Sequence, residues 1–248
     1  MQRKAQGGVV ELVKTVVIAL LIAFGIRTIA FEPFNIPSGS MVPTLLIGDY
    51  LFVSKFSYGY STYSLPYGIH LFSGRIMGRV PERGDVVVFK LPRDPKVDYI
   101  KRVIGLPGDR IQMKAGLLYI NDEPVKRERI EDFVDTENGM LTRTRQFLET
   151  LPNGKVHRIL EMSDSGPYDN TDVYVVPAGH YFCMGDNRDN SLDSRVPVQE
   201  QGVGYVPAEN LVGRAEILFF STDGTAAWYE FWKWLPAMRF SRFFVTIK

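Results

Sequence analysis

The chain has 248 residues, of which 45% are hydrophobic and 23% are charged, and its formal net charge is +1. These values are ordinary for one large or two modest domains with a packed core. The balanced charge and the lack of a basic stripe argue against binding to nucleic acid. The single cysteine, Cys183, excludes an intrachain disulfide and a thiolate metal cluster.

The only long apolar run extends from Val9 to Phe31, and we expect it to be a membrane anchor. Its uncharged centre, Thr15 to Ile26, is shorter than the roughly 20 residues of a span, but long charged side chains near its ends can reach the headgroups. Two alternatives stay open. One is a cleaved signal peptide, although no clean small-x-small cleavage site follows the run, and the other is the buried helix of a soluble protein.

Basic residues are more numerous before the apolar centre than after it. Arg3, Lys4 and Lys14 precede the centre, and Arg27 follows it. Because positively charged flanks tend to stay in the cytoplasm, the pattern predicts a cytoplasmic N-terminus and a body on the outer side of the membrane.

Beyond the anchor, the chain has the period and composition of β-strands. The expected strands are rich in Val, Ile, Tyr and Phe, and Gly and Pro residues separate them. They are Tyr50 to Val53, Asp85 to Phe89, Tyr99 to Ile104, Arg110 to Met113, Leu117 to Ile120, Asp172 to Val176, Tyr181 to Met184 and Ala215 to Phe220. No useful helical period occurs between Pro33 and Asp223. The sequence therefore predicts a mostly β body, built as a coiled antiparallel sheet, a barrel or a sandwich.

The composition divides the chain into four parts. Residues 1–31 form the tail and anchor, residues 32–124 and 171–222 form the β domain, residues 125–170 are an inserted hairpin subdomain, and residues 223–248 are an aromatic C-terminal segment. Residues 57–79, rich in Tyr, Ser and Gly, are expected to form an extended loop.

Ser40 lies between Pro37 and Pro43 and next to Gly39. A serine on such a stiff, sharply turned backbone suits an exposed hydroxyl with free N–H groups that could stabilise an oxyanion. An ordinary linker leaving the membrane explains the same residues. The segment is not a nucleophile elbow, because the required flanking glycines are absent.

Lys101 lies in the expected strand Tyr99 to Ile104. Alternation places Lys101 on one face with Tyr99 and Val103, which would make it a candidate buried amine. Burial would lower its pKa from about 10.4, as a neutral lysine base requires. The alternative is a lysine that extends into solvent from an edge strand.

Gly185 to Arg195 is a dense polar loop that we expect to be held by hydrogen bonds and ion pairs. It does not fit the calcium loop of an EF-hand, because the third and twelfth positions counted from Asp186 are Arg188 and Pro197. The three histidines show no metal-ligand spacing, so no metal or cofactor is expected.

The C-terminal segment contains all three tryptophans of the chain, followed by phenylalanines and arginines. Two interpretations stay open: a helix that caps the core, or an aromatic and basic segment that rests in the membrane interface.

Taken together, four segments resemble bacterial type I signal peptidases, also called leader peptidases. The matching stretches are Glu32 to Leu45, Arg83 to Phe89, Asp98 to Asp109 and Gly185 to Arg195, in the order and spacing of that family. The family cleaves signal peptides after small-x-small sites at the outer face of the membrane. The lysine at position 101 favours the bacterial or organellar branch. The resemblance and the single anchor imply a single-pass protein of the bacterial inner membrane.

The resemblance implies roles for individual residues. Ser40 would be the nucleophile and Lys101 the general base, with the Ser40 N–H and the Ser38 hydroxyl as the oxyanion hole. Ser191 would orient Lys101, while Asp186 would pair with Arg102 and Asp193 with Arg195. Shallow pockets for alanine-sized side chains would be lined by Phe34, Ile36, Pro37 and Ile100, and the Lys101 stem would pack against Tyr99, Phe89 and Cys183.

The resemblance also implies the partners, which are secretory preproteins as substrates and membrane phospholipid, with no nucleic acid and no metal. Two other functions are considered. A self-cleaving Ser–Lys protein related to stress-response repressors would carry a DNA-binding head where the anchor stands. A membrane-tethered β domain that only binds partners would tolerate replacement of Ser40 or Lys101.

Overall fold

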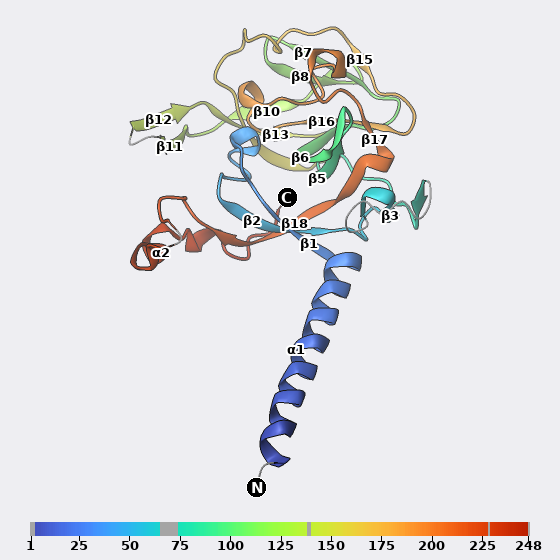
Figure 1. Cartoon of the computed structure of the whole chain (residues 1–248). Helices are drawn as coiled ribbons and strands as arrows, with labels where there is room; N and C mark the ends of the chain where they lie inside the picture. The colour runs from blue at the N-terminus through green and yellow to red at the C-terminus, as the bar shows by residue number, and fades with distance from the viewer. Residues whose placement is uncertain (1–2, 65–73, 138–139, 228, 248) are drawn as a thin grey trace.

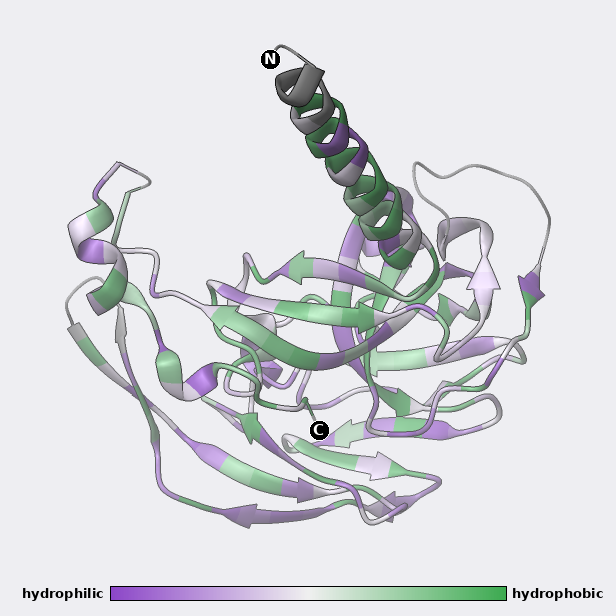
Figure 2. Ribbon diagram, turned by 90° about the horizontal axis from the view of Figure 1, so that it is seen from below, coloured by the Kyte–Doolittle hydropathy of each residue, from purple (hydrophilic) through white to green (hydrophobic). Residues whose placement is uncertain are grey.

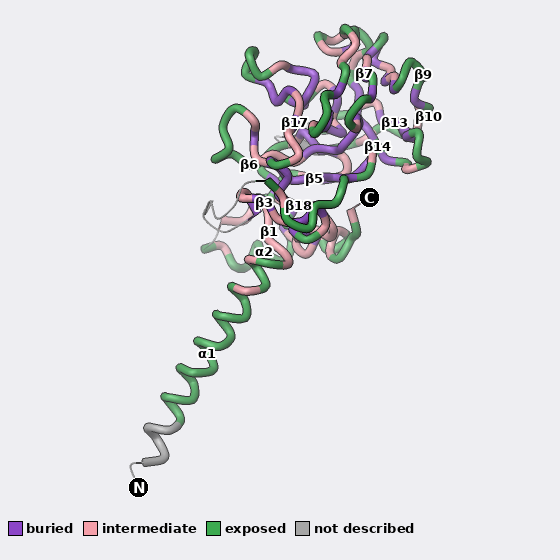
Figure 3. The backbone as a smooth tube through the Cα atoms, turned by 90° about the vertical axis from the view of Figure 1, so that its right-hand side faces the viewer, coloured by how far each residue is buried: buried purple, intermediate pink, exposed green. Residues whose placement is uncertain are grey.

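The computed structural model describes residues 3–64, 74–137, 140–227 and 229–247, which form a β-rich body and one long helix that projects from it (Figure 1). Helix α1 (Arg3–Ile29) includes Gly8–Ile29, a stretch long and apolar enough to cross a membrane. None of that stretch is buried against the body, as Figure 3 shows. The buried-helix alternative is therefore wrong, and the exposed apolar surface fits a membrane anchor.

The main sheet of the body has seven strands that pair antiparallel throughout. Its order is β1-β2-β18-β5-β6-β16-β17. The strands are β1 (Phe31–Asn35), β2 (Asp49–Ser54), β18 (Leu211–Ser221), β5 (Val86–Leu91), β6 (Asp94–Gly105), β16 (His180–Met184) and β17 (Val206–Pro207). A single residue, Ala30, separates α1 from β1, so the helix runs directly into the edge of this sheet.

Smaller antiparallel sheets extend the body. One has the order β15-β7-β8-β9, from Tyr174–Val175, Arg110–Lys114, Leu117–Ile120 and Glu123–Pro124. In the expected insertion, β10 (Lys126–Arg129), β13 (Gln146–Thr150) and β14 (Val156–Leu160) form a sheet, and β11 (Phe133–Glu137) pairs with β12 (Met140–Thr144). The mostly β, antiparallel fold with one N-terminal helix is thus confirmed, while the division of the chain into four parts stays a prediction.

Several expected elements differ in extent. β6 and β18 begin earlier than predicted, and only Tyr174–Val175 of Asp172 to Val176 is a strand. The extended loop at 57–79 contains a short pair, β3 (Tyr60–Ser61) and β4 (Arg75–Ile76), and part of that loop lies outside the described residues. Strand β1 is not among the expected strands. Its Pro33 is tolerated because β1 is an edge strand.

The apolar core consists of three clusters around the main sheet. One contains Met41 and Leu45 packed with Leu51, Val53 and Leu218, and a second contains Phe89, Val103 and Cys183. The third lies under β7 and β8. The first two clusters matter most for function, since they hold residues 36–45 and the middle of β6 in place.

The C-terminal segment does not cap the core with a helix, although Ile247 at its end packs against the first core cluster and Arg242 binds the buried Asp49. Helix α2 (Phe231–Ala237) buries only Ala237, whereas Phe231 is 70% exposed and Trp232 is 61% exposed. Figure 1 shows α2 at the end of the body from which α1 projects, and Figure 2 gives the view of this end from below. The core-capping interpretation is therefore wrong.

Candidate active site

Ser40 lies in a single turn of 3-10 helix, η1 (Gly39–Met41), just after the edge strand β1. Met41 anchors this turn because its side chain is fully buried in the core. The loop that follows β16 holds the turn from the other side: the Asn187 backbone N–H donates to the Ser40 carbonyl over 3.1 Å, and the Asn187 side chain donates to the Gly39 carbonyl over 3.1 Å. These contacts fix the backbone of Ser40, so the segment is not a free linker.

Lys101 projects from β6 toward this turn. Its Nζ donates a hydrogen bond to Ser40 Oγ over 2.6 Å and another to the Ile100 carbonyl over 3.0 Å. Only 3% of the lysine is exposed, so the expected burial is confirmed and the alternative of an edge lysine in solvent is wrong. The stem lies beside the cluster that contains Tyr99, Phe89 and Cys183, and the Tyr99 ring centroid is 5.3 Å from Nζ.

Burial controls the charge of this amine. Desolvation lowers the pKa of Lys101 to about 8, and the nearby Asp193 and Asp186 carboxylates limit the decrease. A lysine with this pKa is neutral in a substantial fraction of molecules slightly above neutral pH. It can therefore accept a proton from the serine hydroxyl that it contacts.

Ser40 and Lys101 line a groove of about 560 Å³. One wall comes from the chain between β1 and η1, the other from residues 97–101 of β6. The groove is lined by all four residues that were expected to contact substrate, which are Phe34, Ile36, Pro37 and Ile100. Ser38, Asn190 and Leu192 line it as well. The walls are mostly apolar, while Ser40 and Lys101 provide reactive polar atoms.

Two buried ion pairs support the site, both as expected. Arg102 donates from Nε and Nη2 to the two oxygens of Asp186 over 2.8 and 2.7 Å, and Arg195 makes two bonds of 2.9 Å to Asp193. Burial alone would raise the pKa of the Asp186 carboxyl, but the Arg102 guanidinium holds it below its usual value. The Thr44 hydroxyl also donates to Asp186, which ties the chain after η1 to the loop after β16.

The expected hydrogen bond between Ser191 and Lys101 is not formed. Ser191 is buried, but its Oγ makes no hydrogen bond to Lys101. The hydroxyl lies instead against Gly185, where a Cβ would come within 2.2 Å of it and within 2.5 Å of the Ser40 carbonyl. The second partner of the amine is the Ile100 carbonyl.

A further buried network was missed by sequence analysis. Arg188 binds both carboxylate oxygens of Glu149, and His157 Nε2 lies 3.3 Å from Glu149 and 3.9 Å from Asp186. These residues belong to the insertion and to the polar loop, and no pattern in the sequence links them. The network joins the insertion to the loop that carries Asp186.

Asp186→Asn is expected to reduce the free energy of unfolding by about 3–5 kcal/mol, because it leaves the buried Arg102 guanidinium without its counter-charge. Urea unfolding of the purified protein measures the change. Asp122→Asn removes an exposed ion pair with Arg110 and should cost less than about 1 kcal/mol. Equal effects for the two variants would contradict the role of Asp186.

Comparison with known proteins agrees with this geometry. Residues 9–220 match the family described as "Signal peptidase, peptidase S26". The signal peptidase I of Rickettsia prowazekii (strain Madrid E) is 44% identical over 247 residues, which cover 92% of this chain and 90% of the relative. That of Rickettsia akari (strain Hartford) is 47% identical over 211 residues, covering 82% and 76%.

Among solved structures, a signal peptidase I from Enterococcus faecalis V583 is 26% identical and covers 55% of this chain and 97% of its own, with a TM-score of 0.32. The sequence matches span nearly the whole chain and include every segment that forms the groove. The chain therefore belongs to the signal peptidase family, peptidase S26.

Proposed function

We propose that this protein is a membrane-anchored serine endopeptidase that removes signal peptides from exported preproteins, with Ser40 as nucleophile and Lys101 as general base. The observation that carries this proposal is the 2.6 Å hydrogen bond between Lys101 Nζ and Ser40 Oγ at an apolar groove. Membership of the signal peptidase family gives the reaction class. The lowered pKa of Lys101 supports its role as base.

In this mechanism, neutral Lys101 takes the hydroxyl proton of Ser40 while Oγ attacks the scissile carbonyl carbon. The carbonyl oxygen becomes an oxyanion, which the Ser40 N–H and the Ser38 hydroxyl stabilise. The C–N bond then breaks, the leaving amine receives the proton from the Lys101 ammonium, and an acyl-enzyme remains on Ser40. Water, deprotonated by the same lysine, hydrolyses the ester and regenerates the hydroxyl.

The groove favours an extended peptide. β5 pairs with one edge of β6 at Asp98, Tyr99 and Ile100, but β16 begins to pair with the other edge only at Arg102. Among the described strands, none occupies the second edge between residues 94 and 101. A substrate strand can therefore add its backbone hydrogen bonds there, as in β-augmentation. Alternate side chains would enter the apolar groove, where walls that include Ile36 and Ile100 favour small residues such as alanine at small-x-small sites.

Ser38→Ala is expected to lower kcat by about 100- to 1000-fold with little change in KM, because the lost donor acts on the oxyanion and not on the bound substrate. The exposed Ser38 side chain makes no capping bond to η1, so the replacement should not disturb the turn. Ser38→Thr keeps a hydroxyl and should retain most of the activity. Steady-state kinetics on a preprotein compare the three proteins, and an unchanged kcat in Ser38→Ala would remove Ser38 from the mechanism.

The anchor and the aromatic C-terminus bring the groove to the membrane surface. Exposed rings occur on α2, and half-buried rings occur on β2 and β18, where Phe52 and Phe219 stack with centroids 4.3 Å apart. Rings at such a face suit the headgroup region of phospholipid. The basic residues before the apolar centre favour a cytoplasmic N-terminus, so the proposed location is the bacterial inner membrane with the body on its outer face.

The deciding experiment uses full-length protein in detergent with a preprotein that carries an Ala-x-Ala site. We expect cleavage after the second alanine and none when that alanine is replaced by leucine. Cleavage of the enzyme's own chain alone would favour the self-cleaving alternative. Binding of the preprotein without hydrolysis would favour the tethered binding module, and either result would overturn the proposal.

A further inference from the structure

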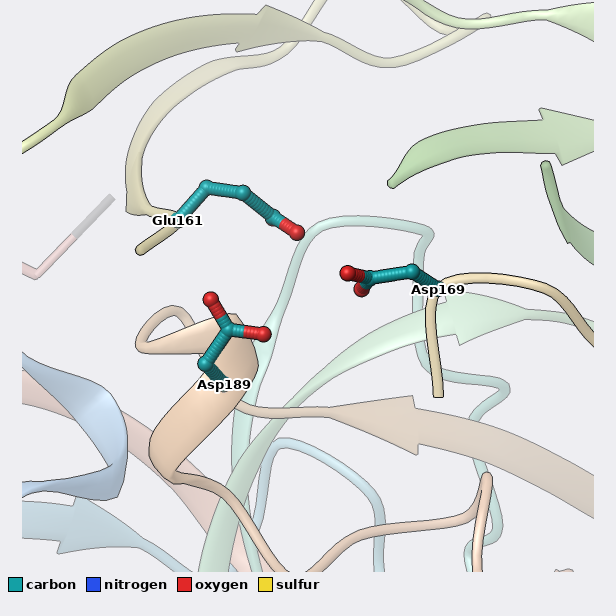
Figure 4. A group of neighbouring side chains, drawn as sticks. All are labelled: Glu161, Asp169 and Asp189. Atoms are coloured by element: carbon teal, nitrogen blue, oxygen red, sulfur yellow. The ribbon is translucent and has the colours of Figure 1, made fainter. Parts of the chain in front are cut away.

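Three carboxylates converge where the insertion meets the loop of the active site. Figure 4 shows Glu161, Asp169 and Asp189 pointing toward one another from three separate segments. Each offers an oxygen atom that lies within 4.8 Å of those of the other two. Their spacing of 8 and 20 residues gave no metal-binding pattern in the sequence, because only the fold brings them together.

The hydrogen bonds at this point leave oxygens directed into the cluster. Asp189 Oδ2 accepts from the Met162 and Ser163 N–H groups over 2.5 and 3.0 Å, and Asp169 Oδ2 accepts from the Gly166 N–H over 2.5 Å. Asp169 Oδ1, by contrast, is buried and has no partner among the described residues. One oxygen of each aspartate therefore fixes the loop, and the other is left for a ligand.

Glu161 is the decisive observation. Its side chain is fully buried, and neither carboxylate oxygen has a hydrogen-bond partner among the described residues. A buried carboxylate without a partner is costly, so native proteins seldom keep one without a cation, a proton or a bound water. No arginine forms a hydrogen bond with the Glu161 carboxylate among the described residues: Arg188 binds Glu149, and both Arg127 and Arg145 bind Asp164. Arg188 and Arg145 each keep one buried N–H group without a partner, so the arginines only partly offset the charge.

We propose that Glu161, Asp169 and Asp189 bind one Ca²⁺ ion. Ca²⁺ takes carboxylate oxygens at 2.3–2.6 Å in flexible geometry, which allows ligand oxygens up to roughly 4.6–5.2 Å apart. Mg²⁺ requires a smaller, nearly octahedral set and fits less well. The ion would tie the 3-10 turn η4 (Arg188–Asn190), whose Asn190 lines the groove, to the segment 161–169 at the end of the insertion. The competing explanation is a proton, since burial raises the pKa of Glu161 to about 8.

Glu161→Gln tests the proposal cleanly, because the carboxylate makes no hydrogen bond that the amide would lose. Full-length protein in detergent is freed of metal with EGTA, and CaCl₂ and MgCl₂ are titrated separately by calorimetry. We expect one Ca²⁺ per chain with a Kd in the range of about 10⁻⁴–10⁻³ M, weaker Mg²⁺ binding, and an increase in Tm with Ca²⁺. In Glu161→Gln the affinity should fall at least tenfold.

Glu200→Gln removes an exposed carboxylate elsewhere and should bind Ca²⁺ as the unmodified protein does. If Glu161→Gln fails to fold, Asp189→Asn replaces it, since its amide oxygen can still accept from Met162 and Ser163. No Ca²⁺ binding by the unmodified protein, or equal binding by the cluster variants, would overturn the proposal and leave a proton as the occupant. Because binding is measured without substrate, the result is independent of the peptidase proposal.

Discussion

Ser40→Ala is expected to lower kcat for preprotein cleavage by about 10⁴- to 10⁶-fold, because the variant has no atom that can form the acyl-enzyme. The loss should appear in kcat rather than in KM, since Ser40 Oγ contacts Lys101 and forms only a small part of the groove wall. Single-turnover cleavage followed on a gel, with enzyme in excess, gives the rate constant over this range.

Two controls make the Ser40 result specific. Ser241→Ala removes an exposed hydroxyl near the C-terminus and should leave kcat unchanged. A trap for acyl-enzyme, such as an active-site-directed acylating inhibitor, should label the unmodified protein and not Ser40→Ala. Labelling of the variant at another serine, or cleavage within tenfold of the unmodified rate, would show that Ser40 is not the nucleophile.

Lys101→Met is expected to have an effect of similar size, about 10⁴-fold or more on kcat, because the serine loses its base. The unmodified protein should show the origin of this effect in its pH profile. Only the neutral amine accepts a proton, so kcat/KM should rise with pH and level off above the Lys101 pKa of about 8. At pH 6 the neutral fraction, and with it the rate, should be about 100-fold below the plateau. A flat profile from pH 6 to pH 10 would exclude lysine as base.

The same lysine should reduce stability. Its pKa is about 8 in the folded protein and about 10.4 in the unfolded chain, so the unfolded state binds more protons between these values. Stability should therefore rise as pH increases from 8 to 10.5 and be lower by up to about 3 kcal/mol below pH 8. Lys101→Met should remove this pH dependence and raise the free energy of unfolding at pH 7, whereas the exposed Lys126→Met should do neither. A Lys101→Met protein that is both inactive and less stable would indicate a structural role only.

Local patterns in the sequence predicted the site well where one element carries the information. Strand alternation placed Lys101 on the apolar face of β6, and the stiff segment around Ser40 became the turn η1. Both properties depend on neighbours within a few residues. The meeting of Ser40 and Lys101 across 61 positions depends on how η1 packs against β6, and the sequence alone gives no measure of that distance.

The features that were missed depend on long-range contacts. Strand β1 was not expected, and the edge position of β1 in the sheet makes the missing N–H of its Pro33 harmless. The resemblance implied a hydrogen bond between Ser191 and Lys101, yet the amine bonds to the Ile100 carbonyl and not to Ser191. Glu149 binds Arg188 and His157 lies 3.9 Å from Asp186 in the polar loop only because the insertion folds back onto that loop.

The buried thiol beneath the lysine has a practical consequence for topology mapping. Cys183 is the sole cysteine and is inaccessible to solvent, and burial raises the pKa of its thiol above the usual value. Since the thiolate is the reactive species, maleimides should not modify the native chain. Cys183 therefore does not need to be removed before labelling. A cysteine introduced near either end of α1 would be the only reactive thiol, and its labelling would show which side of a bilayer that end of α1 faces.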